Sequence, residues 1–160
     1  MKKIFIGALG VLSIFGTAAG WIATAKKKND LINYKDFRIN KFKMYFDVTN
    51  EWVRLKNQGK NLDEFFVKNG WSDIAIYGMG ELGNRLLEEL KGSSVTVKYA
   101  IDEHTDNVFS DMEVKEPNGE LTPVDVIVVT PFFEYEKIEE KLMNLVEYPV
   151  VSIEDIIFSM

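Results

Sequence analysis

The chain has 160 residues, 46% hydrophobic and 28% charged, which is enough to bury one good core and hardly two. It has no cysteine, which excludes disulfides, thiolate metal sites and a cysteine nucleophile, and with a single histidine we expect no metal site. Residues 1–60 hold 12 Lys and Arg against 4 Asp and Glu, whereas residues 61–160 hold 7 against 21. The larger part is therefore acidic, which argues against a nucleic-acid partner because phosphate chains would repel it.

The first expected element is a membrane helix. Residues 4–25 carry no charge, and a helix of that length spans roughly 33 Å, against a bilayer core of about 30 Å. Lys26–Lys28 follow at headgroup level, so we expect residues 1–28 to be a single-pass anchor in the inner (cytoplasmic) membrane, with the C-terminal domain in the cytoplasm. A cleaved signal peptide ending at Ala23-Thr24-Ala25 and a buried helix of a soluble protein are the alternatives. The spacing Gly16-x-x-x-Gly20 would let two anchors pair, which makes a homodimer a further expectation.

A basic helical connector is expected over residues 29–70. Apolar residues recur at spacings of three and four from residue 36 to residue 58, which predicts an amphipathic helix that ends at Gly59. A shorter helix with Asn61 as its N-cap should follow and end at Gly70. Both helices are expected to pack on the next domain. In the alternative, their lysines lie against anionic lipid.

The third segment, residues 71–160, opens with a strand, a glycine-rich turn and a helix. Asp73–Tyr77 is a short apolar run, and the turn Gly78-Met79-Gly80-Glu81-Leu82-Gly83 leads into the helical pattern NRLLEEL. Gly78 suits the tight turn, Gly80 would let a pyrophosphate approach bare backbone, and Gly83 would allow the helix to pack closely on the strand. The amino terminus of the helix would offer N–H groups and partial positive charge to the phosphates.

A second predicted strand, Val95–Ile101, ends at Asp102, 19 residues after Gly83. An acid at this spacing accepts hydrogen bonds from ribose hydroxyls in dinucleotide-binding folds. Residues 103–120 are polar and hold one short strand around Met112–Val114 or none.

The remaining elements continue the alternation of strand and helix. Val124–Thr130 is a nearly all-apolar strand, typical of one buried on both faces of a parallel sheet, and Pro131 ends it. A charged helix over residues 134–146, a strand over 149–152 and a last helical turn over 154–158 follow. The fold class is therefore predicted to be α/β, a small doubly wound parallel sheet (Rossmann-like), preceded by the membrane helix and the amphipathic helix pair.

Ligands of such sheets bind at the carboxyl ends of the strands. The predicted binding residues are Gly78, Met79, Gly80, Glu81, Leu82, Gly83, Asp102, Glu103, Thr130 and Pro131. Glu103 disfavours a 2′-phosphate, so NAD is preferred to NADP, whereas Glu81 inside the turn opposes a pyrophosphate. A nucleotide sugar or mononucleotide, and an empty fold that has lost its ligand, are therefore kept as alternatives.

The segments IAIYGMGELGNRLLEEL, VKYAIDEHTD and VDVIVVTP resemble the small Rossmann-like NAD(P)- or nucleotide-binding domains that accompany bacterial surface-polysaccharide biosynthesis enzymes. They are also similar to the amino-terminal domains of sugar O-acyltransferases. The resemblance covers roughly residues 71–157. It implies nucleotide contact at Gly78, Gly80, Gly83 and Asp102, NAD or a nucleotide sugar as the ligand, and a protein partner in cell-envelope biosynthesis.

No catalytic residue is indicated by the sequence. His104 is expected to be a solvated loop residue, Glu88 and Glu89 a solvated helix face, and Phe132 and Phe133 part of the core. Three hypotheses follow: a membrane-tethered nucleotide-binding accessory module, a minimal NAD-dependent oxidoreductase or epimerase completed by a partner subunit, and a structural adaptor without ligand.

Overall fold

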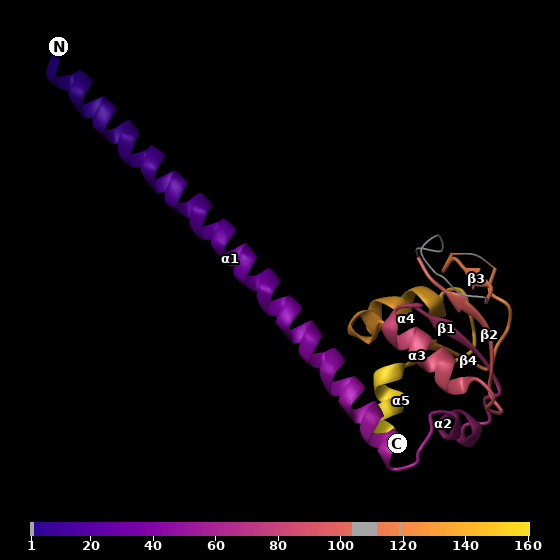
Figure 1. Ribbon diagram of the computed structural model, residues 1–160. Coiled ribbons are helices and arrows are strands. Elements are labelled where there is room, and N and C mark those ends of the chain that lie inside the picture. Colours follow the sequence, from indigo (N-terminus) through magenta and orange to yellow (C-terminus); the bar gives the residue numbers. More distant parts are fainter. Residues whose placement is uncertain (1, 104–111, 119) are drawn as a thin grey trace. The chain divides into compact units, whose positions relative to one another are not determined.

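The computed structural model describes residues 2–103, 112–118 and 120–160, with side chains from residue 24 onward (Figure 1). His104 lies outside the described residues. The chain falls into two compact units, Met1–Met44 and Tyr45–Met160. All the strands and the remaining helices belong to the second unit.

The first unit is helical, and its helix α1 extends over Lys2–Asn57. The sequence predicted two separate helices, before residue 28 and after residue 36, and that separation is wrong. The linking residues 26–35 include neither proline nor glycine, so nothing in them ends a helix. In the part of the chain whose side chains are described, no helix is long and apolar enough to cross a membrane. Most of the predicted anchor, residues 4–25, lies outside that part.

The end of α1 and the short helix α2, Asp63–Lys68, lie in the second unit. The predicted stops are confirmed, since Gly59 and Gly70 have the positive φ angles of 77° and 73° that favour glycine after a helix. The N-cap of α2 is Leu62 rather than the predicted Asn61. The Asn61 N–H donates to the Glu64 carboxylate instead (3.2 Å), so a local side-chain bond forms one residue outside the helix start.

The sheet has five parallel strands in the order β3-β2-β1-β4-β5. The strands are β1 (Asp73–Tyr77), β2 (Thr96–Ile101), β3 (Val114–Lys115), β4 (Val126–Val129) and β5 (Val150–Ser152). Helix α3 (Glu81–Leu90) follows β1, a 3-10 turn η2 (Phe132–Glu134) and helix α4 (Tyr135–Met143) follow β4, and helix α5 (Ile153–Ser159) follows β5. The predicted α/β class and parallel sheet are confirmed, including the short strand near residue 114.

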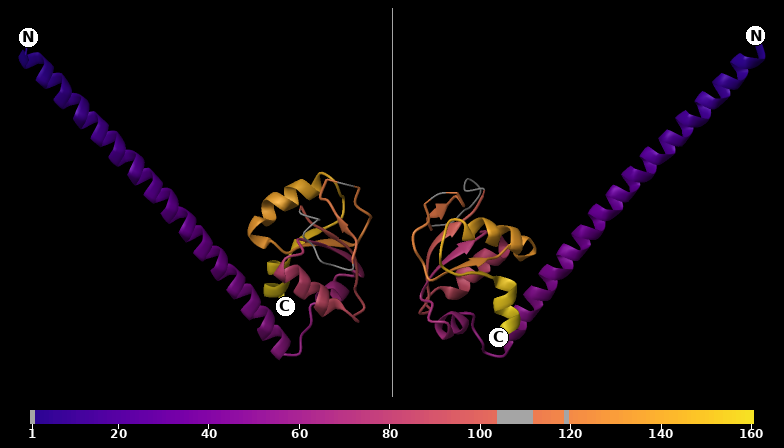
Figure 2. Two further views of the ribbon diagram at one scale, coloured as in Figure 1. Left: turned by 45° about the horizontal axis from the view of Figure 1, so that its top comes forward. Right: turned by 180° about the vertical axis from the view of Figure 1, so that it is seen from behind.

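Helices cover both faces of the sheet (Figures 1 and 2). Alternate residues of β1 point to opposite sides: Ile74 and Ile76 pack with α3, α5, α2 and the end of α1, whereas Ala75 and Tyr77 pack with α4. The predicted packing of the connector on the domain is confirmed for its last turns, where Val48, Trp52 and Leu55 are buried. The carboxyl ends of β1, β2 and β4 are left at one edge, which carries the candidate site.

Candidate functional site

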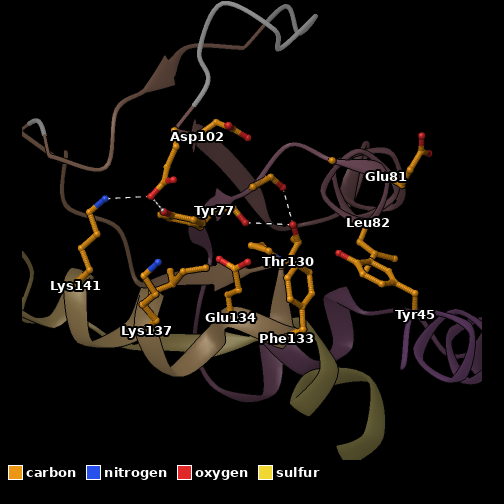
Figure 3. A pocket seen from close by; sticks show the side chains of 15 residues that line it. Tyr45, Tyr77, Glu81, Leu82, Asp102, Thr130, Phe133, Glu134, Lys137 and Lys141 are labelled. Carbon is orange, nitrogen blue, oxygen red and sulfur yellow. Dashed lines mark hydrogen bonds and ion pairs between the residues drawn. The ribbon is translucent and has the colours of Figure 1, made fainter. Parts of the chain in front are cut away.

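A cavity of about 280 Å³ lies at the carboxyl edge of the sheet (Figure 3). The chain leaves β1 toward β2 on one side, and β4 lies on the other side, so this is the point where the strand order reverses and where ligands bind in open α/β sheets. Eight of the ten predicted binding residues line the cavity: Gly78, Gly80, Glu81, Leu82, Asp102, Glu103, Thr130 and Pro131. The structure therefore brings together residues that are up to 53 positions apart in the sequence.

The three glycines of the turn are in different environments. Gly78 has φ of 87°, and a Cβ there would lie 2.6 Å from Cδ of Pro131. A Cβ on Gly83 would lie 2.2 Å from the Gly78 carbonyl oxygen, so only glycine lets α3 begin so close to β1. At Gly80, by contrast, an added Cβ would meet nothing within 4 Å, and this residue is the N-cap of α3. Gly78 and Gly83 are thus required by packing, while Gly80 borders open space.

One buried and one partly buried polar side chain hold the turn in place. The Thr130 hydroxyl, 3% exposed, lies 2.6 Å from the Gly78 carbonyl oxygen, to which it donates, and the Thr130 N–H donates to the carbonyl of Tyr77. The Asn84 amide nitrogen donates to the carbonyls of Met79 and Gly80, both at 3.0 Å. The Thr130 contacts join the ends of β1 and β4, and the Asn84 contacts join the turn to α3. Sequence analysis identified Thr130 but not Asn84, because a single amide in a helical pattern carries no signal of what it binds.

Asp102 faces the turn across the end of the sheet. One of its carboxylate oxygens accepts the N–H of Met79 at 2.9 Å. The Met79 side chain is itself buried in the core, at 7% exposure, and does not line the cavity. The Glu81 carboxylate points away from the other labelled side chains (Figure 3). Of the three long side chains of the turn, that of Met79 therefore lies outside the cavity, whereas Glu81 and Leu82 form part of its wall. Asp102 both braces the turn and forms part of the same wall.

The end of the cavity beside β2 carries charged groups from α4. Lys141 Nζ lies 3.2 Å from Oε1 of Glu103, and the Tyr77 hydroxyl donates to the same oxygen at 3.3 Å. The hydrogen bond from Lys141 holds the pKa of the Glu103 carboxyl below its usual value. Burial, with the negative charge of Glu103 added to it, raises the pKa of Tyr77. Lys137 lines the cavity one helical turn before Lys141.

The other end of the cavity is aromatic. Tyr45, from α1, lies with its ring 5.8 Å from that of Phe133 and 5.1 Å from that of Phe132. Burial, followed by the charge of Glu134, raises the pKa of the Tyr45 hydroxyl. Phe132 is buried as predicted, whereas Phe133 is only partly buried and lines the cavity. Tyr45 falls within the amphipathic helix predicted over residues 36–58, but no local pattern connects that helix with a turn that begins 33 residues after Tyr45.

Glu88 and Glu89, which were both expected on a solvated helix face, differ in exposure. Glu89, expected on a solvated face, is 9% exposed and accepts hydrogen bonds from Trp52 Nε1 (2.6 Å) and the Leu62 N–H (2.7 Å). Its neighbour Glu88 is 52% exposed, as expected. Among the described residues, no three His, Cys, Asp or Glu side chains gather in a group able to hold a metal ion.

No protein-family model, curated protein or solved structure matches the chain. The fold is nevertheless Rossmann-like in character, because five parallel strands in the order 3-2-1-4-5 follow the first five of that fold. Any function must therefore be argued from the cavity and the residues around it.

Proposed function

We propose that the protein is a membrane-anchored module that binds a nucleotide, NAD or a nucleotide sugar, and works beside an enzyme of bacterial cell-envelope polysaccharide biosynthesis. The observation that carries the nucleotide part is the cavity at the strand-order reversal, bordered by Gly80 at the start of α3 and by Asp102 at the end of β2. The proposed role in cell-envelope biosynthesis rests on the resemblance of residues 71–157 to domains that accompany bacterial surface-polysaccharide biosynthesis enzymes. The anchor rests on the uncharged stretch of residues 4–25.

The phosphate end of the ligand would lie at the amino terminus of α3. The first N–H groups of a helix have no partner within it and carry partial positive charge, so they bind anions. The space over Gly80 is open to such an approach. The Thr130 and Asn84 bonds fix the carbonyls of the turn, and a turn held in place in advance loses less entropy when a ligand binds.

The ribose would lie at Asp102. A carboxylate has about four lone-pair positions, so a carboxylate that accepts the Met79 N–H has capacity for ribose hydroxyls as well. The bond to Met79 orients the Asp102 side chain toward the turn. This arrangement links the ribose position with the phosphate position through a single side chain.

The protonation states of Tyr77 and Glu103, which line the cavity, favour a role in ligand binding over a role in acid-base catalysis. The pKa of Tyr77 is raised and that of Glu103 is lowered, so both groups move away from neutrality. A general acid or base works best with a pKa near the operating pH. Tyr77 would thus remain a hydrogen-bond donor and Glu103 an acceptor across the physiological range.

The test is ligand binding by the full chain in detergent micelles. Isothermal titration and thermal unfolding would be measured with NAD, UDP-glucose, ATP and coenzyme A, because a ligand that binds only the folded state raises its melting temperature. We expect saturable binding of a nucleotide. No binding at millimolar concentration of any of them would refute the proposal, and turnover of NAD with a sugar nucleotide would favour the oxidoreductase hypothesis.

Gly80→Asp provides the site-specific variant. The φ of −73° accepts any residue, and aspartate is a favourable N-cap, so the fold should be unaffected. A carboxylate about 4 Å from a phosphate costs about 4 kcal/mol at an effective dielectric constant of about 20, roughly a 10³-fold loss of affinity. Gly80→Asn is the uncharged control and should lose much less. Equal affinity of the Asp and Asn variants would contradict a phosphate at this position.

Membrane attachment is tested separately. We expect the full chain in a bacterial host to sediment with membranes and to be released by detergent but not by high salt. Deletion of residues 2–25 should move it to the supernatant. Release of the full chain by salt alone would contradict a spanning anchor.

A further inference from the structure

Aromatic rings form the wall of the cavity at the end away from β2. The rings of Tyr45 and Phe133 line the cavity and contact each other, and the Tyr45 ring also contacts that of Phe132. In a Rossmann fold the two halves of a dinucleotide lie on the two halves of the sheet, on either side of the point where the strand order reverses. Phe133 follows β4, the first strand beyond that point, and Tyr45 lies against Phe133 (Figure 3).

The turn after β1 and the turn after β4 also differ in what they could offer to a phosphate. The β1 half has the glycine-rich turn and the start of α3. After β4 the chain continues with Thr130-Pro131-Phe132, which has no glycine, and proline has no N–H to offer a phosphate. The Thr130 hydroxyl is directed to the Gly78 carbonyl. The turn after β4 therefore supports the first half instead of forming a second nucleotide site.

The volume of the cavity agrees with one nucleotide. About 280 Å³ lies at the lower limit of small-molecule sites, which span about 300–1,000 Å³. A dinucleotide is two nucleotides joined through their phosphates and needs a longer site. Asp102 and Glu103 lie at the β2 end, together with two lysines of α4, whereas the rings of Tyr45 and Phe133 lie at the other end, where Glu134 is close enough to act on the Tyr45 hydroxyl.

From the aromatic wall, the unequal turns and the volume, we propose that the site takes a single nucleoside diphosphate, free or sugar-linked, and that Tyr45 and Phe133 exclude the second nucleotide of NAD. This inference rests on the proposed function and narrows it. The nucleoside lies toward Asp102 and Glu103, and the diphosphate lies over Gly80. Tyr45 is then a specificity-determining residue supplied by α1, the helix that begins in the predicted anchor.

The test compares ligands that share one nucleotide. ADP, ADP-ribose and NAD form a series of increasing length, and UDP and UDP-glucose distinguish a free from a sugar-linked diphosphate. Affinities would be measured by isothermal titration on the full chain in micelles. We expect ADP or UDP to bind at least about tenfold more tightly than NAD, a difference of about 1.4 kcal/mol.

Tyr45→Ala should reduce the ratio of the NAD dissociation constant to the ADP dissociation constant at least about threefold, because it removes a ring that bounds the cavity. Tyr45→Phe keeps the ring and should keep the ratio. Phe46→Ala is the matched control, since Phe46 is the next residue on α1, is 68% exposed and does not line the cavity. Ratios are compared rather than melting temperatures, so a general loss of stability in one variant does not affect the result.

The outcomes separate the two proposals. NAD affinity within about threefold of ADP in the unmodified chain would overturn the single-nucleotide inference and leave the proposed function standing. An unchanged ratio in Tyr45→Ala would overturn the role of Tyr45. Absence of binding by all five ligands would refute the proposed function itself.

Discussion

Glu89→Ala tests the hydrogen bonds that connect α3 with α1 and with the start of α2. In the folded chain the Glu89 carboxylate, 9% exposed, accepts the Trp52 indole N–H at 2.6 Å and the Leu62 backbone N–H at 2.7 Å, and it pairs with Lys56 at 3.2 Å. Trp52 and Leu62 are themselves buried, at 6% and 1% exposure. Truncation removes the acceptor and leaves two buried donors without a partner.

The expected cost follows from these contacts. Each buried donor left unsatisfied costs about 1–3 kcal/mol, and the half-exposed Lys56 pair adds at most about 1 kcal/mol. We therefore expect Glu89→Ala to lower the free energy of unfolding by about 2–7 kcal/mol. That is a large share of the roughly 5–15 kcal/mol by which domains are stable. Glu89→Gln retains one acceptor oxygen and should lose less.

The adjacent residue provides the control. Glu88 is 52% exposed and pairs with Arg85 on the helix surface, so Glu88→Ala should change stability by about 0.5 kcal/mol or less. Urea unfolding followed by tryptophan fluorescence and far-ultraviolet circular dichroism gives both values. Equal midpoints for Glu88→Ala and Glu89→Ala would refute the reasoning, because they would show that the buried contacts contribute no more than a surface pair.

Three further predictions concern the site and its support. Gly83→Ala should destabilise the fold by about 1–3 kcal/mol in urea unfolding, because its Cβ meets the Gly78 carbonyl, whereas Gly80→Ala should cost about 1 kcal/mol or less; equal losses would contradict the assigned packing. Thr130→Val should lower the free energy of unfolding by about 1–2 kcal/mol through the lost hydroxyl bond, and no change would show that this bond is not needed. Asp125 accepts the N–H groups of two residues at the start of β1, which lowers its pKa, so its contribution to stability is present above the ordinary value of about 3.9 and is lost as the pH falls through the lower folded value. The difference in urea midpoint between the native chain and Asp125→Asn should accordingly shrink from pH 6 to pH 2, and a constant difference would contradict this.

Local patterns were sufficient to predict the unit β1–α3–β2. An apolar run, three glycines at fixed spacing and an amphipathic helix each depend on neighbours in sequence, so the strands could be placed to within one residue and the start of the helix to within three. The spacing of Gly78 and Gly83 also predicted their packing roles, which the added-Cβ distances agree with. The pattern did not predict the hydrogen bond from the Met79 N–H to Asp102, because the segments that follow β1 and β2 must come together to form it.

The continuous helix α1 shows a different limit. The apolar segment and the amphipathic segment were each predicted from their own residues, whereas the residues between them carry no signal for a helix end. Charge alone does not end a helix, whereas glycine or proline does.

The sequence by itself determined the α/β class, the parallel sheet, the glycine turn and the position of Asp102, because these follow from residue types and spacings within short segments. Only the tertiary structure decided that Tyr45 and Phe133 close one end of the cavity, that Lys141 and Tyr77 hold Glu103, and that Glu89 is buried rather than solvated. The physical reason is that burial and hydrogen bonding at these positions come from segments about 25 to 90 residues apart, which only the packing of both faces of the sheet brings together.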